Sequence, residues 1–433
     1  MSDADRDKAT GGAGSHSEDD ADTEQALRTR LLERARALLA ANHREGVSPW
    51  EGRRYDYTCP SAHSYPFQWF WDSCFHAIAL TRIDIELAKA ELRSLARGAR
   101  PDGFMPHIIF WQPDRAVMAR QTLRLSTPYL SASIQPPVIA LALERVYRAS
   151  GDDRFRDELL PVVAAFFRWL RDNRDPDGDD LIAVVQPDES GVDASPKYDP
   201  LLGYPGDNDD LVRAINAIYA RYEPLGNDDR RIIAADVFVV EDVLVNSIYA
   251  QGLQSLARLT RDPGEAAEYR AWAGRVLGAL MEKCYDPARG LFLDLLGTEE
   301  RRTEVNTISA LFPLIVEGLD PAIAERLVAD HLRNPAEYAL PYPVPSVAAN
   351  APGFNPDHPH GFIWRGPTWV NSNWFLAHAL RDRGYVEDAR RIGAATRSLV
   401  DTQGFRECYN PYTGEGQNAS GFGWTSLVVD FPS

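Results

Sequence analysis

The sequence predicts an all-α fold, a toroid of paired helices with long substrate-binding loops at one end. Amphipathic helical periodicity recurs along the chain, and only residues 181–185 and 290–295 alternate like strands. Tight turns at 151–153 and 261–263 contrast with long loops rich in aromatic residues, and long ordered loops usually carry function. We therefore expect the site where these loops meet, at 51–71, 99–128, 186–232, 335–367 and 403–424.

The chain reads as one domain preceded by a short tail. Its 433 residues, 44% of them hydrophobic, suffice for a large core. Residues 1–22 are acidic and lack hydrophobic periodicity, which predicts a disordered tail. No break in composition divides residues 23–433, so we predict a single catalytic domain. Its helices are expected near 23–42, 73–97, 133–150, 154–172, 239–260, 264–285, 305–315, 320–334, 368–383 and 385–402.

Charge and cysteine content narrow the class of protein. Forty-six basic against sixty-three acidic side chains give a net charge of −17, which argues against nucleic acid and anionic membranes as partners. No stretch approaches the roughly 20 apolar residues of a membrane span, and no signal-peptide core is present. We expect a cytoplasmic protein that acts on a small molecule, with a homo-oligomer compatible with the sequence. Reduced thiols are the expected state of Cys59, Cys74, Cys284 and Cys408.

Two acids lie in loops rich in Gly, Pro and aromatic residues. Asp193 belongs to Gln-Pro-Asp-Glu-Ser-Gly-Val-Asp-Ala-Ser-Pro, and Glu407 to Gly-Phe-Arg-Glu-Cys-Tyr-Asn-Pro-Tyr-Thr-Gly. Hydrolysis of a glycosidic bond needs one carboxyl group that protonates the leaving oxygen and another that activates a water. Such loops suit that chemistry, although spacing alone does not choose among Asp188, Glu189 and Asp193 for the acid.

Aromatic residues gather in two further segments, 65–76 and 360–374. Indole rings offer flat apolar faces to sugars, and the neighbouring Asp72 can hold ring hydroxyls. The alternative is that Asp72 caps a helix beginning at residue 73 while the aromatic residues form core. Gln135, which precedes Pro-Pro, fits either a sugar contact or a bridge between loops.

In the second segment, Gly366 would let the backbone approach a ligand closely. Ordinary core packing is the alternative for Trp369 and Trp374, and we favour it for Trp374.

Metal chemistry is not expected. Residues 175–180, Asp-Pro-Asp-Gly-Asp-Asp, resemble a calcium loop, but the twelfth position is Gln186 where such loops carry Glu. We interpret this segment as a solvated turn. The nine histidines form no HExxH motif and no i, i+4 pair, so we predict neither a metal nor another cofactor.

Four motifs together resemble glycoside hydrolase family 63, and within it the compact bacterial enzymes that hydrolyse mannosylglycerate and glucosylglycerate. They are Trp-Asp-x-x-Phe-His (71–76), Glu-Ser-Gly-x-Asp-x-Ser (189–195), Trp-Arg-Gly-Pro-x-Trp (364–369) and Glu-x-Tyr-Asn-Pro-x-Thr-Gly (407–414). They follow the family's order over residues 24–430.

The resemblance implies an (α/α)6 barrel and an inverting mechanism, with Asp193 as general acid and Glu407 as general base. A loop that binds the glycerate carboxylate would correspond to Arg213 and Tyr219, although Arg213 also has Asp209 and Asp210 as neighbours to pair with. The sugar-binding residues that the resemblance implies are Tyr65, Trp69, Trp71, Asp72, Gln135, Trp364, Gly366 and Trp369.

The predicted function is hydrolysis of glucosylglycerate or mannosylglycerate with release of the hexose. One alternative is an α-glucosidase or trehalase-like enzyme that acts on a neutral disaccharide, for which Arg213 would hardly matter. Another is a sugar epimerase or isomerase, which would need proton-relay histidines such as His76 or His107 at the mouth of the barrel. A non-catalytic sugar-binding protein would tolerate loss of Asp193 or Glu407.

Overall fold

The computed structural model describes residues 13–112, 124–175, 177–203, 206–357 and 363–432, which are mostly helical. The α-helices are α1 (Ala13–Asn42), α2 (Phe70–Leu80), α3 (Ile85–Arg97), α5 (Ile139–Ser150), α6 (Asp153–Arg174), α7 (Asp199–Leu202), α8 (Asn208–Tyr222), α9 (Asp229–Ala234), α10 (Val243–Leu259), α11 (Pro263–Ala279), α12 (Pro321–Arg326), α13 (Val370–Asp382) and α14 (Val386–Gln403). Short 3₁₀ and π segments are η1 (Pro187–Ser190), η2 (Pro196–Tyr198), η3 (Glu223–Leu225), η4 (Leu280–Cys284), η5 (Ile308–Ile315), η6 (Leu327–Leu332) and η7 (Gly423–Asp430).

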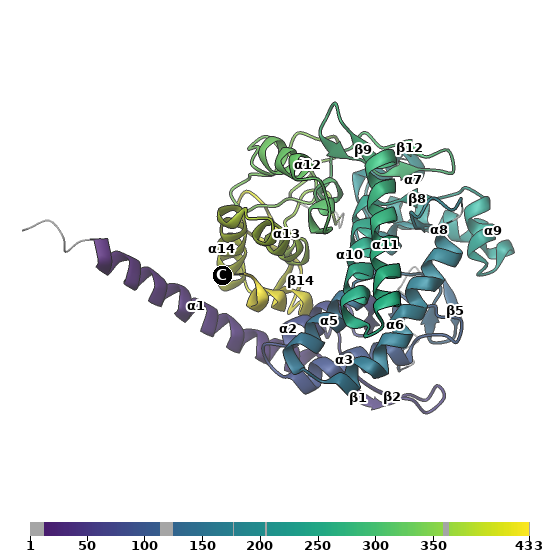
Figure 1. Ribbon diagram of the computed structural model, residues 1–433, viewed down its shortest axis with the longest axis horizontal. Coiled ribbons are helices and arrows are strands. Elements are labelled where there is room, and N and C mark those ends of the chain that lie inside the picture. Colours follow the sequence, from purple (N-terminus) through teal and green to yellow (C-terminus); the bar gives the residue numbers. More distant parts are fainter. Residues whose placement is uncertain (1–12, 113–123, 176, 204–205, 358–362, 433) are drawn as a thin grey trace, which may run out of the picture.

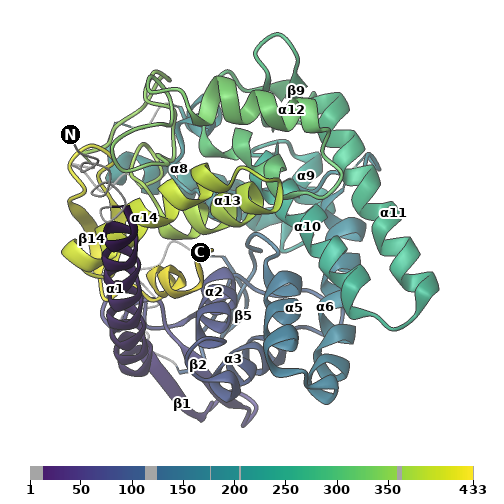
Figure 2. The ribbon, with the colours of Figure 1, turned by 60° about the vertical axis from the view of Figure 1, so that its left-hand side comes forward.

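Six helical segments contact one another in a closed order. The order is α2, α5, α10, η5, α13 and η7, and η7 in turn contacts α2. Every residue of α2 is buried, and α13 is buried from Val370 to Leu380, as expected for helices with apolar residues on all sides. The helices that follow them expose one face to solvent. In Figure 2, α2, α5, α10 and α13 surround the middle of the molecule while α3, α6 and α11 lie outside them.

The first helix packs against η7 and α14, and its N-terminal half projects away from the rest of the molecule in Figure 1. The sequence predicts a helix from residue 23, whereas α1 begins at Ala13. Residues 13–22 are thus helical where we expect disorder, because adding residues to an existing helix is much easier than nucleating one. Residues 1–12 of the expected tail lie outside the described residues.

Most predicted helices are confirmed, with differences at particular residues. The helix expected over 73–97 is two helices, because Asp84 accepts the N–H groups of Glu86 and Leu87 and begins α3. The helix expected from residue 133 begins at Ile139, after two prolines that supply no N–H. Helix α8 lies within a segment expected to be loop, and α9 begins in the same segment.

Strands are short and antiparallel. Two-stranded sheets pair β1 (His43–Val47) with β2 (Arg54–Thr58), β9 (Tyr285–Asp286) with β10 (Leu291–Phe292), and β13 (Arg406–Tyr409) with β14 (Gly416–Ser420). The four-stranded sheets have the orders β3-β4-β6-β5, from Gln68–Trp69, Ile108–Ile109, Leu130–Ser131 and Leu125–Thr127, and β12-β11-β8-β7, from Arg301–Arg302, Leu295–Leu296, Val240–Glu241 and Ala183–Val184. The strands expected at 181–185 and 290–295 are confirmed as β7 and β10.

One large hydrophobic core extends through these helical segments, and all four cysteines are buried and unpaired. Among the described residues, no helix combines the length and apolar character that crossing a bilayer demands.

Candidate active site

A pocket lies where several ring segments begin. Trp71 and Asp72 stand in the first turn of α2, Trp369 directly precedes α13, and Trp424 begins η7. Nine residues predicted for the site line this pocket: Tyr65, Trp69, Trp71, Asp72, Gln135, Asp193, Trp364, Trp369 and Glu407. The remaining lining residues are Pro60, His107, Gly191, Ile363, Phe422 and Trp424.

The structure separates the three acids that compete for the role of general acid. Glu189 is fully buried, where Arg174 binds both its oxygens (2.5 and 2.7 Å). The carboxylate of Glu189 also accepts the backbone N–H groups of Ile134 and Val185, so it organises the loop. Asp188 does not line the pocket, whereas Asp193 does.

Asp193 keeps part of its side chain exposed to the pocket. Burial, together with the charges of Asp188, Glu407 and Asp72, raises the pKa of Asp193 well above its usual range. Gly191, just before it, has φ +71°, and a Cβ there would lie 2.5 Å from the Trp71 ring. The loop therefore approaches Trp71 so closely that only glycine fits.

Glu407 comes from β13 and is 5% exposed. Its carboxylate accepts the Ala419 N–H at 3.2 Å and the Tyr65 hydroxyl at 3.3 Å. Burial raises the pKa of Glu407 to about 7, although these two hydrogen bonds act in the opposite direction. Asp193 and Glu407 thus share one pocket in which burial raises the pKa of both carboxyl groups. A carboxyl group with a raised pKa can stay protonated and act as an acid, while an ionised partner acts as a base.

Asp72 lies inside the first turn of α2 and is not the helix cap, because Trp69 occupies that position. Burial raises the pKa of Asp72 well above its usual range. The Trp71 N–H donates instead to the side-chain oxygen of Gln135 at 3.0 Å. Gln135 therefore bridges two loops and lines the pocket at the same time, so the two predicted roles do not exclude each other.

Four indole rings form one wall of the pocket. Trp364 and Trp369 are stacked in parallel, with ring centroids 3.8 Å apart, and Trp424 meets Trp71 edge-on at 5.4 Å. Trp364 has φ +64°, a conformation uncommon for a bulky residue and typical of functional sites. Sequence reasoning missed Trp424, although its Phe-Gly-Trp context offered an aromatic signal. Trp374 belongs to the core as expected, and its Nε1 donates to Asp430 at 3.2 Å.

Gly366 does not line the pocket. A Cβ at this position would meet the backbone carbonyl of Asn355 at 2.8 Å, so the glycine permits a close approach between two chain segments. A close approach of its backbone to a ligand stays a prediction.

His107 is a pocket residue for which sequence reasoning proposed only an epimerase role. It packs edge-on against Trp69 at 4.8 Å, and neither ring nitrogen has a hydrogen-bond partner among the described residues. Burial lowers the pKa of His107 to about 3, so the ring is neutral. His76 lies outside the pocket, and its Nδ1 contacts the Thr58 carbonyl at 3.0 Å. A neutral ring can bind a hydroxyl but is poorly suited to proton relay.

Arg213 and Tyr219 lie on α8 and do not line the pocket. The guanidinium of Arg213 is exposed and pairs with Asp210, the alternative partner considered above. Tyr219 hydrogen-bonds to Asp188 and packs against the small apolar cluster of Ala194, Leu211 and Ile215. The structure does not bring this pair together with the other predicted residues.

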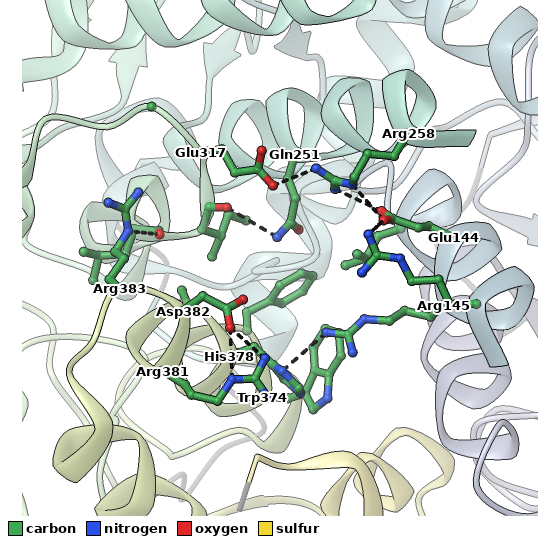
Figure 3. A pocket seen from close by; sticks show the side chains of 17 residues that line it. Glu144, Arg145, Gln251, Arg258, Glu317, Trp374, His378, Arg381, Asp382 and Arg383 are labelled. Atoms are coloured by element: carbon green, nitrogen blue, oxygen red, sulfur yellow. Dashed lines mark hydrogen bonds and ion pairs between the residues drawn. The ribbon is translucent and has the colours of Figure 1, made fainter. Parts of the chain in front are cut away.

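A second cavity lies at the opposite ends of the ring helices, where α5, α10 and α13 finish (Figure 3). Its charges are largely satisfied: Arg258 binds Glu144 and Glu317, and Arg383 donates to backbone carbonyls. Basic side chains at helix C-termini complement the helix dipole. We therefore assign these arginines to stabilisation of the helix ends.

The chain is similar to known enzymes over most of its length. Residues 65–425 match the family model described as "Mannosylglycerate hydrolase MGH1-like glycoside hydrolase domain". A mannosylglycerate hydrolase of Thermus thermophilus is 33% identical over 415 residues, which cover 87% of this chain and 96% of that relative. A glucosylglycerate hydrolase of Mycolicibacterium hassiacum is 28% identical over 415 residues, covering 84% and 91% respectively.

The chain is also similar in structure to a solved enzyme of this kind. A family 63 mannosylglycerate hydrolase from Thermus thermophilus, in complex with Tris and D-glycerate, has a TM-score of 0.79 and 30% identity, with 94% of this chain and 99% of that chain covered. The similarity therefore extends over whole enzymes.

Proposed function

Because this chain belongs to the family of mannosylglycerate hydrolase MGH1-like glycoside hydrolases, we propose that it is an inverting hydrolase that releases a hexose from mannosylglycerate or glucosylglycerate. The main support is the pocket in which Asp193 and Glu407 stand beside stacked indole rings, where burial raises the pKa of both carboxyl groups. Both kinds of relative named above act on glycerate conjugates.

The closed order of ring contacts supports a barrel. The inner layer would be α2, α5, α10, η5, α13 and η7, with α3, α6, α11, η6, α14 and α1 as their outer partners. Twelve segments in two layers make an (α/α)6 toroid, and we propose that residues 23–433 form it as one catalytic domain. The unpaired cysteines fit a reducing cytoplasm.

In the proposed reaction, the protonated carboxyl of Asp193 donates its proton to the glycosidic oxygen as the bond to the anomeric carbon breaks. The carboxylate of Glu407 takes a proton from a water, and the oxygen of that water attacks the anomeric carbon from the opposite face. The products are a hexose of inverted anomeric configuration and the free glycerate. An inverting enzyme holds its two carboxyls roughly 6.5–9.5 Å apart, so that the water fits between them.

The remaining pocket residues would hold the sugar. Asp72 offers a carboxyl group. Gln135 uses its oxygen in the loop bridge, which leaves its amide N–H groups without a partner among the described residues. His107 adds a neutral ring that has no partner among the described residues. Stacked indoles supply the apolar face for the hexose ring. The proposal that Arg213 and Tyr219 bind the glycerate carboxylate rests on the family resemblance, because Arg213 lies outside the pocket.

Proton NMR of the purified enzyme tests the function. The anomeric signal is followed from the first minutes with mannosylglycerate, glucosylglycerate and trehalose as substrates. Initial release of the β-hexose from one glycerate conjugate is the expected result. Turnover of trehalose alone would remove the glycerate assignment, and initial release of the α-hexose would contradict inversion.

Two variants test the residues. Asp193→Asn and Glu407→Gln are each expected to lower kcat by at least about 10³-fold, because a group that acts in the transition state is lost. Glu415→Gln is the matched control, since Glu415 is an exposed acid in the same β13–β14 hairpin. If either variant retained near-normal kcat, the residue that it replaces would not be a catalytic residue.

A further inference from the structure

We propose that Asp177, Asp179, Glu241 and Glu300 form a binding site for a divalent cation of the calcium class, at which the ammonium group of Lys283 is the competing internal cation. The inference is independent of the glycosidase assignment. It revises our sequence-based interpretation of residues 175–180 as a solvated turn.

The four acids come from three segments that one small sheet holds together. Asp177 and Asp179 belong to the loop before β7, Glu241 lies on β8, and Glu300 lies in the turn between β11 and β12. One oxygen of each carboxylate lies within 4.8 Å of the corresponding oxygens of the others. Calcium binds oxygen at about 2.4 Å, so ligands on opposite sides of the ion stand about 4.8 Å apart. The four oxygens thus fit one coordination sphere.

Glu241 supplies the observation that distinguishes this cluster from a solvated group of acids. Its side chain is 5% exposed, and its Oε2 has no hydrogen-bond partner among the described residues. Burial and the charges of Asp179, Glu300 and Asp177 raise the pKa of Glu241 to about 9. A buried carboxyl group without a partner is costly unless a cation compensates it.

Lys283 neutralises only part of the cluster. Its Nζ lies 2.6 Å from both Asp179 and Glu300 and 3.6 Å from Asp177, and it makes no ion pair with Glu241 within 4.0 Å. One ammonium therefore faces four carboxyl groups. The lysine side chain is 27% exposed and ends a flexible stem, so it can leave the cluster when a divalent ion enters.

The structure also explains why residues 175–180 resemble only part of a calcium loop. A calcium loop draws its last ligand from its own twelfth position, which is Gln186 here. Glu241 and Glu300, more than 50 residues further along the chain, provide carboxylates beside the loop instead. The carboxylate of Asp175 accepts the N–H groups of Gly178, Asp179 and Asp180, and so fixes the loop internally.

A bound ion would tie the loop to the sheet that leads to the catalytic segment. Strand β7 follows the loop directly and pairs with β8, which carries Glu241. After β7 the chain enters η1 and then reaches Asp193. Binding is therefore expected to stabilise the folded protein by mass action, and the midpoint of thermal unfolding should rise with ion concentration.

The test uses the full chain after treatment with a chelator and dialysis. Isothermal titration with CaCl2 is expected to show one saturable site, and the Tm is expected to rise over the same concentration range. Lys283→Met is expected to bind calcium about tenfold more tightly, because the competing ammonium is gone; tenfold equals about 1.4 kcal/mol. Glu241→Gln keeps the shape of the side chain and is expected to abolish saturable binding.

Glu299→Gln is the matched control, since it removes an exposed acid next to Glu300 and should leave calcium affinity unchanged. The proposal is overturned if the native chain does not bind CaCl2, or if Glu241→Gln binds it as well as the native chain does. Binding by Lys283→Met alone would also overturn the proposal, because Lys283 would then be the permanent cation of the native protein.

Discussion

At the scale of single residues, the site depends on what surrounds two ordinary carboxyl groups. Asp193 faces the charges of Asp188, Glu407 and Asp72, whereas Glu407 keeps two hydrogen bonds to its carboxylate. The sequence context showed both residues, but it did not show these neighbours. It therefore could not choose among Asp188, Glu189 and Asp193 without the family resemblance. The ion pair between Arg174 and Glu189 is the physical reason for excluding Glu189, and it was not visible in sequence spacing.

The pH dependence of activity is expected to report Glu407. A general base must be ionised, so kcat/KM should fall as pH drops through about 7, the pKa of Glu407. Tyr65→Phe removes a hydrogen bond that lowers this pKa, so the acidic limb should move to higher pH. The measurement is a pH profile of kcat/KM, with Tyr412→Phe as a control at an exposed tyrosine. An unchanged limb in Tyr65→Phe would mean that another group titrates.

The ionised carboxylate of Glu407 is expected to lower the free energy of unfolding at high pH. Its folded-state pKa is raised to about 7 from an ordinary 4.5, so the proton it binds favours folding at low pH and that contribution is lost as pH rises through 7. Glu407→Gln should therefore increase the free energy of unfolding by roughly 3 kcal/mol at pH 8.5 and by less than about 1 kcal/mol at pH 5. Denaturant unfolding at both pH values measures this. A destabilised variant at pH 8.5 would contradict the sign.

At the scale of elements, periodicity predicted the helices, while their exact ends depended on chemistry between segments. Gln135 accepts the N–H of Trp71 and so completes the start of α2 from a distant loop. The β13–β14 hairpin that presents Glu407 lay in a segment expected to be loop, because its strands are short and carry no clear alternation. Helix α8 was also expected to be loop, although Asp207 caps it and its apolar residues recur at helical spacing.

The loop before Asp193 should depend on Gly191. Gly191→Ala forces a Cβ to 2.5 Å from Trp71 at φ +71°, so the loop or the ring must move. We expect kcat to fall at least about tenfold and stability to fall by about 1–3 kcal/mol, as for overpacking. Gly151→Ala is the control, because Gly151 has φ +63° but no atom within 4 Å and thus measures backbone strain alone. Equal effects of the two variants would mean that contact with Trp71 is unimportant.

Helix α8 carries Arg213, whose proposed role in binding the glycerate carboxylate rests on the family resemblance. If Arg213 binds the glycerate carboxylate, Arg213→Ala should raise KM for the glycerate conjugates about tenfold and leave kcat nearly unchanged. The Tm should not change, because an exposed ion pair such as Arg213–Asp210 contributes about 0–1 kcal/mol. Steady-state kinetics with Arg221→Ala, on the same helix, provide the comparison. An unaltered KM would remove Arg213 from the site.

At the scale of the whole molecule, helical periodicity predicted the fold class, and the net charge argued against nucleic acid as a partner. The sequence could not give the order in which segments close the ring, since that order depends on contacts between residues far apart, such as those of α2 with η7. The sequence also could not show that a cavity lies at each end of these helices. The pole where helices begin holds the indoles and acids, whereas the pole where they end holds paired arginines (Figure 3).

The net charge of the whole chain has a kinetic consequence for the proposed substrate. A protein with a net charge of −17 repels an anionic glycerate conjugate during diffusional encounter. Salt screens this repulsion, because the Debye length shortens from about 30 Å at 0.01 M to about 8 Å at 0.15 M ionic strength. We therefore expect kcat/KM to rise about two- to threefold over this range while kcat stays constant, since the bound complex no longer depends on encounter. Steady-state kinetics in NaCl and in KCl check that the effect is electrostatic and not specific to one ion. A fall in kcat/KM would show that a local cationic group near the pocket outweighs the global charge, and Arg213→Ala should then abolish that fall.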